Sequence, residues 1–208
     1  MKKLVAGLCE FRTNTRPKLK SLFEKLAKGQ HPETLYIGCS DSRVMPSLFT
    51  TAAPGDIFVI RNVGNLVAPC GANGRADKHD SVWAAVEYAL LELKIANIII
   101  CGHSECGAVK AAVSKQIPEG CSHLAEWVKQ VGTLESCNEN QLTPGISELN
   151  KASQANVICQ IKNLKTSPLV QKALELENLK IHGWWFDIAK AHIYEFNSKT
   201  ETFCLLQE

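Results

Sequence analysis

The chain has 208 residues, which is enough for one domain with a sizeable apolar core. Apolar residues make up 45% and charged residues 21%, as in an ordinary globular protein, and no apolar run reaches the roughly 20 residues of a membrane-spanning helix. The 23 basic and 21 acidic side chains leave a formal charge of only +2, without a long block of either sign. We therefore expect a single domain over residues 1–208, with neither a nucleic acid nor a membrane as its partner.

The nine cysteines are an odd number in a chain that can fold around an apolar core, so a disulfide framework explains them poorly. Near the N-terminus, the pair Lys2 and Lys3 precedes an apolar stretch that already ends at Cys9, which is too short for a secretion signal. We expect a cytoplasmic protein whose cysteines are free thiols or metal ligands.

The segment 2–28 carries apolar residues at helical spacing, and Gly29 provides a stop. Residues 1–30 are therefore predicted to form an N-terminal helical arm. Short runs rich in β-branched and aromatic residues predict strands farther along the chain. These strands are expected at Thr34–Gly38, Asp56–Asn62, Ile95–Cys101, Leu179–Phe186, Ala191–Phe196 and Thr202–Leu206, the last two as a hairpin.

Helical patterns alternate with these strands along the chain. They cover 81–93 with Ser81 as N-cap, Ala108–Ser114, an interrupted region from 119 to 150, Ala155–Leu164 and Pro168–Glu177. Such alternation predicts an α/β fold in which helices flank a mainly parallel central β-sheet.

Two polar turns follow the first and third predicted strands. One is Cys39-Ser40-Asp41-Ser42-Arg43, and the other is Gly102-His103-Ser104-Glu105-Cys106-Gly107. Open parallel sheets place ligand sites beyond the carboxyl ends of their strands, so the sheet can bring the two turns together. Zinc favours thiolate and imidazole ligands, and a catalytic zinc keeps three protein ligands and one open position. Cys39, His103 and Cys106 supply three such ligands.

An isolated His-x-x-Cys tetrad would be weak evidence in a chain with nine cysteines and six histidines, and the second turn strengthens it. Asp41 and Arg43 flank a serine and point to one side of an extended segment, where a guanidinium can hold a carboxylate ionised. The alternative is a surface ion pair of little energetic value. An aspartate two residues from a metal thiolate can ligate zinc or accept a hydrogen bond from zinc-bound water.

In these turns and beyond them, the chain resembles the β-class carbonic anhydrases. The shared stretches occur in the family's order and at its spacing. They are Cys39–Val44, Gly55–Asn65, Ala84–Ala89, Cys101–Gly107 and Ile181–Trp184.

The resemblance implies reversible hydration of carbon dioxide to bicarbonate and a proton by a zinc-bound hydroxide. Cys39, His103 and Cys106 would hold the Zn²⁺ ion, while Asp41 and Arg43 would act as a catalytic dyad that orients the zinc-bound water. Asp41 would ligate zinc only in a closed, inactive form.

In the plant-like subtype of the family, a glutamine, a phenylalanine and a tyrosine line the carbon dioxide pocket. Gln30, Phe58 and Tyr88 stand at these positions here, and Val63 would add apolar surface, although Phe58 and Val63 are equally well explained as core residues.

The other subtype has a separate bicarbonate site made by a tryptophan, an arginine and a tyrosine. The corresponding residues here are Tyr36, Arg61 and Phe186, so only the arginine is kept. We therefore expect the open arrangement, with Asp41 paired to Arg43. The family's dimer, built partly by the arm, implies a homodimer or a larger even-numbered assembly.

Two other functions are compatible with the same turns. One is an enzyme of this fold that acts on carbonyl sulfide or carbon disulfide, which are also linear molecules. The other is a zinc-stabilised binding module in which Asp41 permanently fills the fourth zinc position. Both alternatives keep the three zinc ligands. They differ in the substrate that reaches the zinc or in the group that fills its fourth position.

Overall fold

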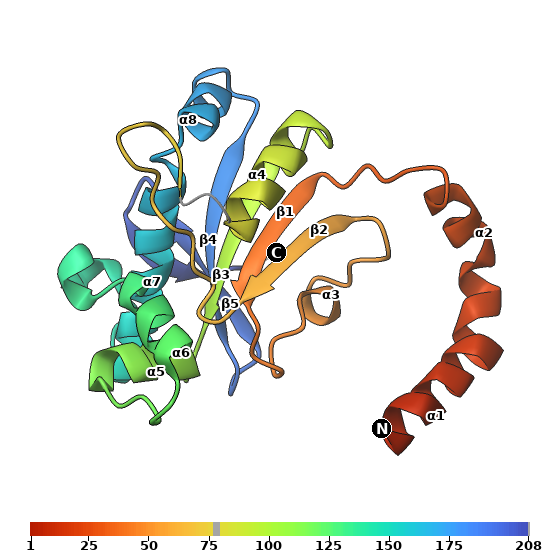
Figure 1. Cartoon of the computed structure of the whole chain (residues 1–208), viewed down its shortest axis with the longest axis horizontal. Coiled ribbons are helices and arrows are strands. Elements are labelled where there is room, and N and C mark those ends of the chain that lie inside the picture. The colour runs from red at the N-terminus through yellow and green to blue at the C-terminus, as the bar shows by residue number, and fades with distance from the viewer. Residues whose placement is uncertain (77–79, 208) are drawn as a thin grey trace.

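The computed structural model describes residues 1–76 and 80–207. Its centre is a six-stranded sheet in the order β2-β1-β3-β4-β5-β6 (Figure 1). The strands are β1 (Thr34–Cys39), β2 (Ile57–Asn62), β3 (Asn97–His103), β4 (Lys180–Asp187), β5 (His192–Asn197) and β6 (Thr202–Leu205). The first four strands of the sequence run parallel, and β5 and β6 continue the sheet as an antiparallel hairpin. The mainly parallel sheet expected from the sequence is confirmed.

Eight α-helices lie in the described part of the chain. They are α1 (Lys2–Glu10), α2 (Arg16–Leu26), α3 (Pro46–Phe49), α4 (Ser81–Leu91), α5 (Gly107–Ser114), α6 (Ser122–Trp127), α7 (Glu148–Leu164) and α8 (Pro168–Glu175). Short helical turns complete the set: η1 (Phe11–Thr15), η2 (Val128–Gln130), η3 (Leu134–Ser136) and η4 (Glu139–Gln141). Among the described residues, no helix combines the length and the apolar character needed to cross a membrane.

Three details of the helices differ from the sequence expectation. Asp80, and not Ser81, caps α4, because its Oδ1 accepts hydrogen bonds from the backbone N–H groups of Val82 and Trp83. The region 119–150, expected to be helical with interruptions, is less helical than expected, with α6, three short turns and only the first residues of α7. Helix α7 begins at Glu148, before the expected Ala155. Its first turns carry polar residues that are partly buried, so the apolar periodicity does not mark where the helix starts.

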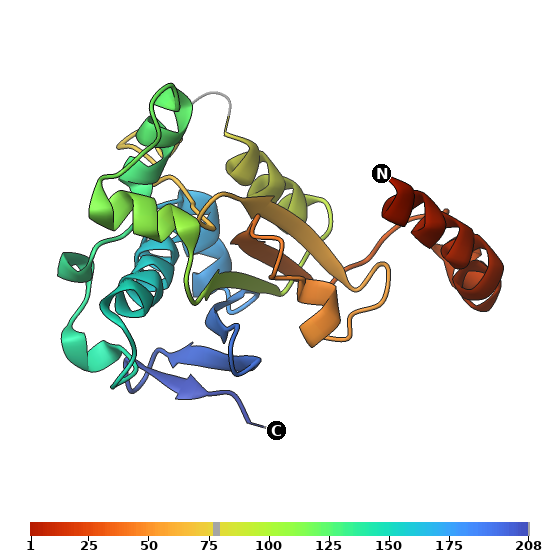
Figure 2. The same cartoon turned by 90° about the horizontal axis from the view of Figure 1, so that it is seen from below.

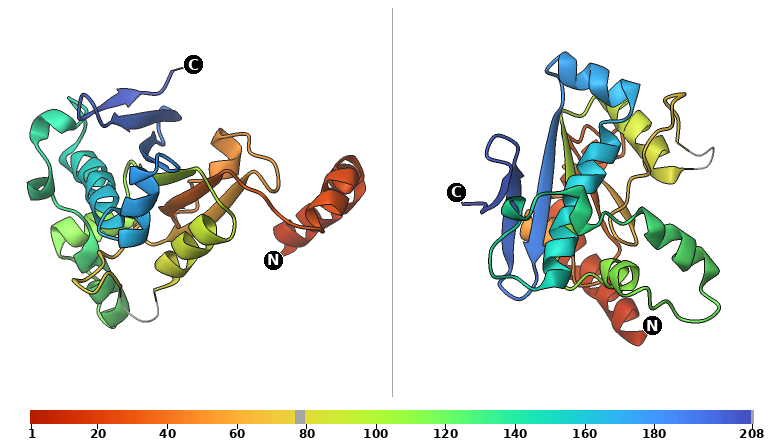
Figure 3. Two further views of the ribbon diagram at one scale, coloured as in Figure 1. Left: turned by 90° about the horizontal axis from the view of Figure 1, so that it is seen from above. Right: turned by 90° about the vertical axis from the view of Figure 1, so that its left-hand side faces the viewer.

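The central strands are buried on both faces. Leu35 and Ile37 of β1 face α4, α7 and α8, which cover one side of the sheet. Tyr36 of β1 faces the other side, where it clusters with Phe49 of α3 and with Phe186 of β4. Figure 3 shows the layer of helices against the sheet and the C-terminal hairpin at its edge. Burial on both faces fixes the register of β1, and with it the position of the strand end.

The N-terminal arm, formed by α1, η1 and α2, stands clear of the rest of the chain in Figures 1 and 2. Pro17 has no N–H to donate to the preceding turn, and the helix widens to a π-helical turn just before it. No side chain of Lys2–Leu26 is buried, and Leu4 and Leu8 are 67% and 63% exposed. The arm thus presents apolar side chains that its own chain leaves largely uncovered.

The close approach of α7 to β4 depends on Gly183. A Cβ at this position would lie 2.6 Å from Ile161 Cδ1 and 3.2 Å from Phe196 Cβ. We expect Gly183→Ala to lower the free energy of unfolding by about 1–3 kcal/mol because it overpacks this contact. Thermal unfolding should show the melting temperature falling by roughly 2–4 °C per kcal/mol. Gly107→Ala is the control, because a Cβ there meets nothing within 4 Å; equal melting temperatures would contradict the expectation.

Candidate metal centre

Two neighbouring strand ends bring together the three expected ligands. Gly38 of β1 lies beside Cys101 of β3, so Cys39 and His103 end adjacent strands. Cys106 immediately precedes α5 and completes the group. The ligand atoms of the three side chains lie within 4.8 Å of one another, and all three residues are buried. In residues 1–76 and 80–207, this is the only such group.

The geometry of the three ligands fits a zinc ion. Two sulfurs on tetrahedral zinc lie roughly 3.8 Å apart, given Zn–S bonds of about 2.3 Å, and the Sγ atoms of Cys39 and Cys106 are 4.0 Å apart. His103 Nδ1 donates to the carbonyl of Ser104 over 2.8 Å. Its Nε2 is buried without a hydrogen-bond partner. A nitrogen left in this way is available to a metal, and its orientation is already fixed.

The thiols of Cys39 and Cys106 shift each other's pKa. A hydrogen bond from the Cys106 thiol lowers the pKa of the Cys39 thiol to about 4, although burial acts in the opposite direction. The same contact, together with burial, raises the pKa of Cys106. Of the two thiols, that of Cys39 is the one favoured to ionise, and a divalent cation that displaces the remaining proton would leave two thiolate ligands.

Asp41 and Arg43 form a bidentate pair next to the ligands. Arg43 Nε donates to Asp41 Oδ1 over 2.9 Å, and Arg43 Nη2 donates to Asp41 Oδ2 over 2.7 Å. Mainly because of these side-chain hydrogen bonds, the pKa of the Asp41 carboxyl lies well below its ordinary value of 3.8. Asp41 Oδ2 is 3.8 Å from His103 Nε2. An ionised carboxylate thus sits beside the ligand group.

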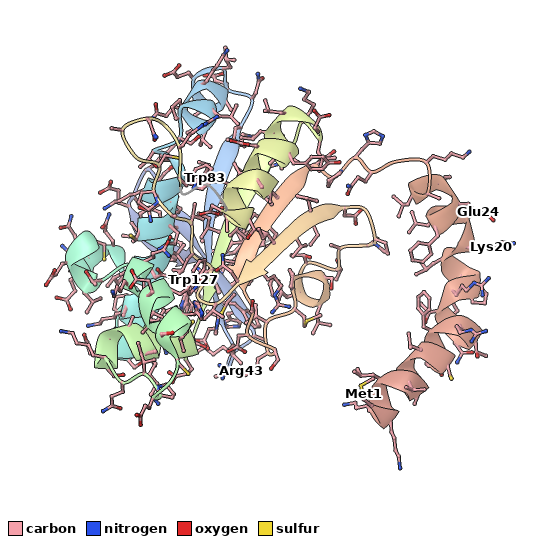
Figure 4. All side chains as sticks on the ribbon, in the orientation of Figure 1. Met1, Lys20, Glu24, Arg43, Trp83 and Trp127 are labelled. Carbon is pink, nitrogen blue, oxygen red and sulfur yellow. The ribbon has the colours of Figure 1, made fainter. Side chains whose placement is uncertain are left out.

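Arg43 also joins the two turns, since its Nη2 donates to the carbonyl of Glu105 over 3.0 Å. Figure 4 shows Arg43 beyond the ends of the parallel strands, on the side opposite to α8. The arginine therefore ties the aspartate of one turn to the backbone of the other.

Several further side chains hold the backbone of these turns. Arg61 Nη2 donates to the carbonyl of Asp41 over 2.7 Å, and its Nε donates to the carbonyl of Cys39 over 2.9 Å. From α7, Ser153 Oγ donates to the carbonyl of His103 over 2.7 Å. The sequence indicates Arg61 only for a separate bicarbonate site and gives no role to Ser153. The signal available for α7 was a set of polar residues at helical spacing.

The four expected substrate residues do not gather at one place in the chain. Val63 follows β2 directly and lies beside the ligand group, with its carbonyl accepting from Trp127 Nε1 over 2.7 Å. Phe58 lies near the start of β2, about 13 Å from the strand end at roughly 3.3 Å per residue. The ring of Tyr88 contacts that of Phe58 at 5.8 Å, and Gln30 is exposed in the segment that joins the arm to β1. Within one chain, only Val63 is next to the ligands.

A family model described as carbonic anhydrase matches residues 34–193, which include both turns and most of the sheet. The chain belongs to the carbonic anhydrase family. A carbonic anhydrase of Synechococcus elongatus is 38% identical over 95% of this chain and 72% of the relative. One from Pseudomonas aeruginosa is 36% identical over 100% of this chain and 93% of the relative.

Solved structures identify the class within the family. The β-carbonic anhydrase CcaA has a TM-score of 0.87 and 36% identity, over 100% of this chain and 92% of the other. One of two tetrameric β-carbonic anhydrases from Sordaria macrospora has a TM-score of 0.77 and 29% identity, over 99% of this chain and 98% of the other. The β class expected from the sequence is confirmed, and with it a zinc-dependent carbonic anhydrase.

The ligand assignment predicts the effect of replacing one thiolate. Cys106→Ser should abolish stoichiometric zinc binding, because a serine hydroxyl is a poor substitute for a thiolate. The measurement is zinc content by mass spectrometry after dialysis against metal-free buffer. Cys101→Ala is the control, since Cys101 is equally buried on β3 but lies outside the ligand group. A full zinc equivalent in Cys106→Ser would show that the ligand set is wrong.

Proposed function

We propose that this protein hydrates carbon dioxide reversibly to bicarbonate and a proton at the Cys39, His103 and Cys106 centre, with Asp41 and Arg43 as the catalytic dyad. The main support is the Nε2 atom of His103, which is buried without a hydrogen-bond partner. It lies beside the sulfurs of Cys39 and Cys106 and the ionised carboxylate of Asp41. Family membership supports the reaction, and the contacts of Asp41 support the roles given to the dyad.

Zinc, when bound, would supply hydroxide near neutral pH by lowering the pKa of a coordinated water. Asp41 accepts hydrogen bonds only, because Arg43 keeps its carboxylate ionised. It would therefore accept a hydrogen bond from a hydroxide held at the centre and so direct an oxygen lone pair toward the carbon of the substrate. Arg43 would hold that carboxylate in place through both of its oxygens.

The apolar pocket is proposed to need a second copy of the chain. Phe58 and Tyr88 contact each other at the far end of β2 from the ligands of their own chain. Strand β2 is an edge of the sheet, and the arm leaves Leu4 and Leu8 uncovered. A homodimer, or a larger even-numbered assembly, would let one copy place Gln30, Phe58 and Tyr88 beside the zinc and Val63 of the other. The tetrameric relatives support self-association.

The proposed activity is tested by stopped-flow measurement of carbon dioxide hydration with zinc content determined on the same samples. We expect zinc-saturated protein to catalyse the reaction, with a rate that rises toward alkaline pH because two thiolates offset the charge of the ion. Asp41→Ala and Arg43→Ala should retain zinc and lose kcat by about a hundredfold. Arg75→Ala, an exposed arginine outside the site, is the control.

Hydration no faster than in buffer, with zinc fully bound, would exclude the proposed reaction. Unchanged turnover in Arg43→Ala would leave the reaction standing and remove the role of the dyad. Carbonyl sulfide and carbon disulfide are assayed alongside, so that a preference for either substrate becomes visible. The cytoplasmic location stays a prediction from the sequence.

The assembly is tested through the arm. Leu8→Asp should lower the molar mass measured by light scattering after size-exclusion chromatography, because a carboxylate cannot be buried unpaired in an apolar contact. Lys3→Asp, a charge change on the same helix, is the control. A molar mass unchanged from that of the unsubstituted assembly in Leu8→Asp would argue against a contact through the arm.

A further inference from the structure

The sulfur of Cys39 accepts a hydrogen bond from outside the ligand group. The backbone N–H of Gly64 donates to Cys39 Sγ over 3.4 Å. Gly64 lies in the loop after β2 and has a φ of +87°, a conformation that favours glycine. A Cβ there would also meet Ala108 Cβ of α5 at 3.0 Å. The loop therefore approaches the metal centre closely at Gly64, and contacts from other parts of the fold are needed to hold it in this conformation.

That support comes from one fully buried side chain of α7. Asn156 Nδ2 donates to the carbonyl of Gly64 over 3.0 Å. Its Oδ1 accepts from the backbone N–H of Gly132 over 2.9 Å and from Gln160 Nε2 over 2.8 Å. Because a backbone N–H can only donate, the amide oxygen must face Gly132 and the amide nitrogen must face Gly64. The orientation of Asn156 is fixed from both sides.

The same face of α7 holds the far end of the loop with other residues. Gln160 Oε1 accepts from the backbone N–H of Val67 over 2.8 Å, and Asn163 Nδ2 donates to the carbonyl of Val67 over 2.9 Å. Asn156 holds the loop at Gly64, and Asn163 holds it at Val67. Two asparagines on one helix thus hold one loop, but only Asn156 binds the residue that donates to the cysteine sulfur.

We propose that Asn156 is a positioning residue of the metal centre: by holding the carbonyl of Gly64, it keeps the Gly64 N–H on the sulfur of Cys39. Hydrogen bonds to a ligating sulfur withdraw charge from it and tune the bound metal, and residues that orient ligands from outside the group change metal affinity substantially. The inference rests on the proposed zinc site. In it, Asn156 does not contact the metal but acts on one ligand, Cys39.

The test uses the full-length protein with ¹¹³Cd in place of zinc and proton–cadmium correlation NMR. A hydrogen bond to a cadmium-bound sulfur transmits scalar coupling from the metal to the amide proton, so we expect a cross-peak at the Gly64 amide. In Asn156→Leu, which keeps the size of the side chain, this cross-peak should disappear. Zinc affinity, measured by competition with a chelator, should fall by about tenfold or more. Asn163→Leu is the matched control and should keep both the cross-peak and the affinity.

The outcomes separate this inference from the proposed function. Cross-peaks from the Cβ protons of Cys39 and Cys106 report metal binding itself, and their absence in the unsubstituted protein would overturn the zinc site. If they are present and the Gly64 cross-peak survives in Asn156→Leu, only the role of Asn156 is refuted. If Asn156→Leu does not fold, Asn156→Asp replaces it, because it keeps the shape and the acceptor facing Gly132. Unchanged coupling and affinity in that variant would refute the inference equally.

Discussion

The parallel pairing of β1 with β3 is the constraint on which the metal centre depends. Leu35 and Ile37 are buried among helices on one face, and Tyr36 is buried on the other. A slip of one residue would exchange these faces, so packing far from the ligands fixes the register. Because the register is fixed, Cys39 and His103 end side by side. Apolar burial and ligand geometry are thus parts of one arrangement.

The sequence predicts those features that depend on local pattern. The apolar run Ile95–Cys101 contains most of β3, the candidate ligands lie at the ends of β1 and β3 and in the turn that follows β3, and the parallel pairing of these strands brings Cys39 and His103 together. The start of α7 was missed because Ser153, before the expected Ala155, is polar yet buried. Its partners are the carbonyl of His103 and the indole N–H of Trp185, both far away in the sequence, and a pattern that treats polar residues as exposed has no means of finding such contacts.

The positions of the expected substrate residues relative to the candidate ligands could not be predicted from the sequence of a single chain. The resemblance gave Gln30, Phe58 and Tyr88 a role at the pocket, but spacing along the sequence does not say which copy's pocket they line. In the fold, the ligands lie at one end of the parallel strands and the ring of Phe58 at the other. A long exposed arm and an edge strand at β2 are consistent with the proposed assembly, in which one copy would complete the pocket of another.

The depth of the three ligands has a consequence for how the metal leaves. His103, Cys106 and Cys39 are 0%, 1% and 5% exposed, whereas the side chains of Asp41 and Arg43 are 17% and 48% exposed. Exchange of these ligands would therefore need local opening of the turns that carry them, so loss of an ion would be coupled to the local stability of the fold. A substitution that destabilises the turns would then speed the release of metal even where it leaves all three ligands in place.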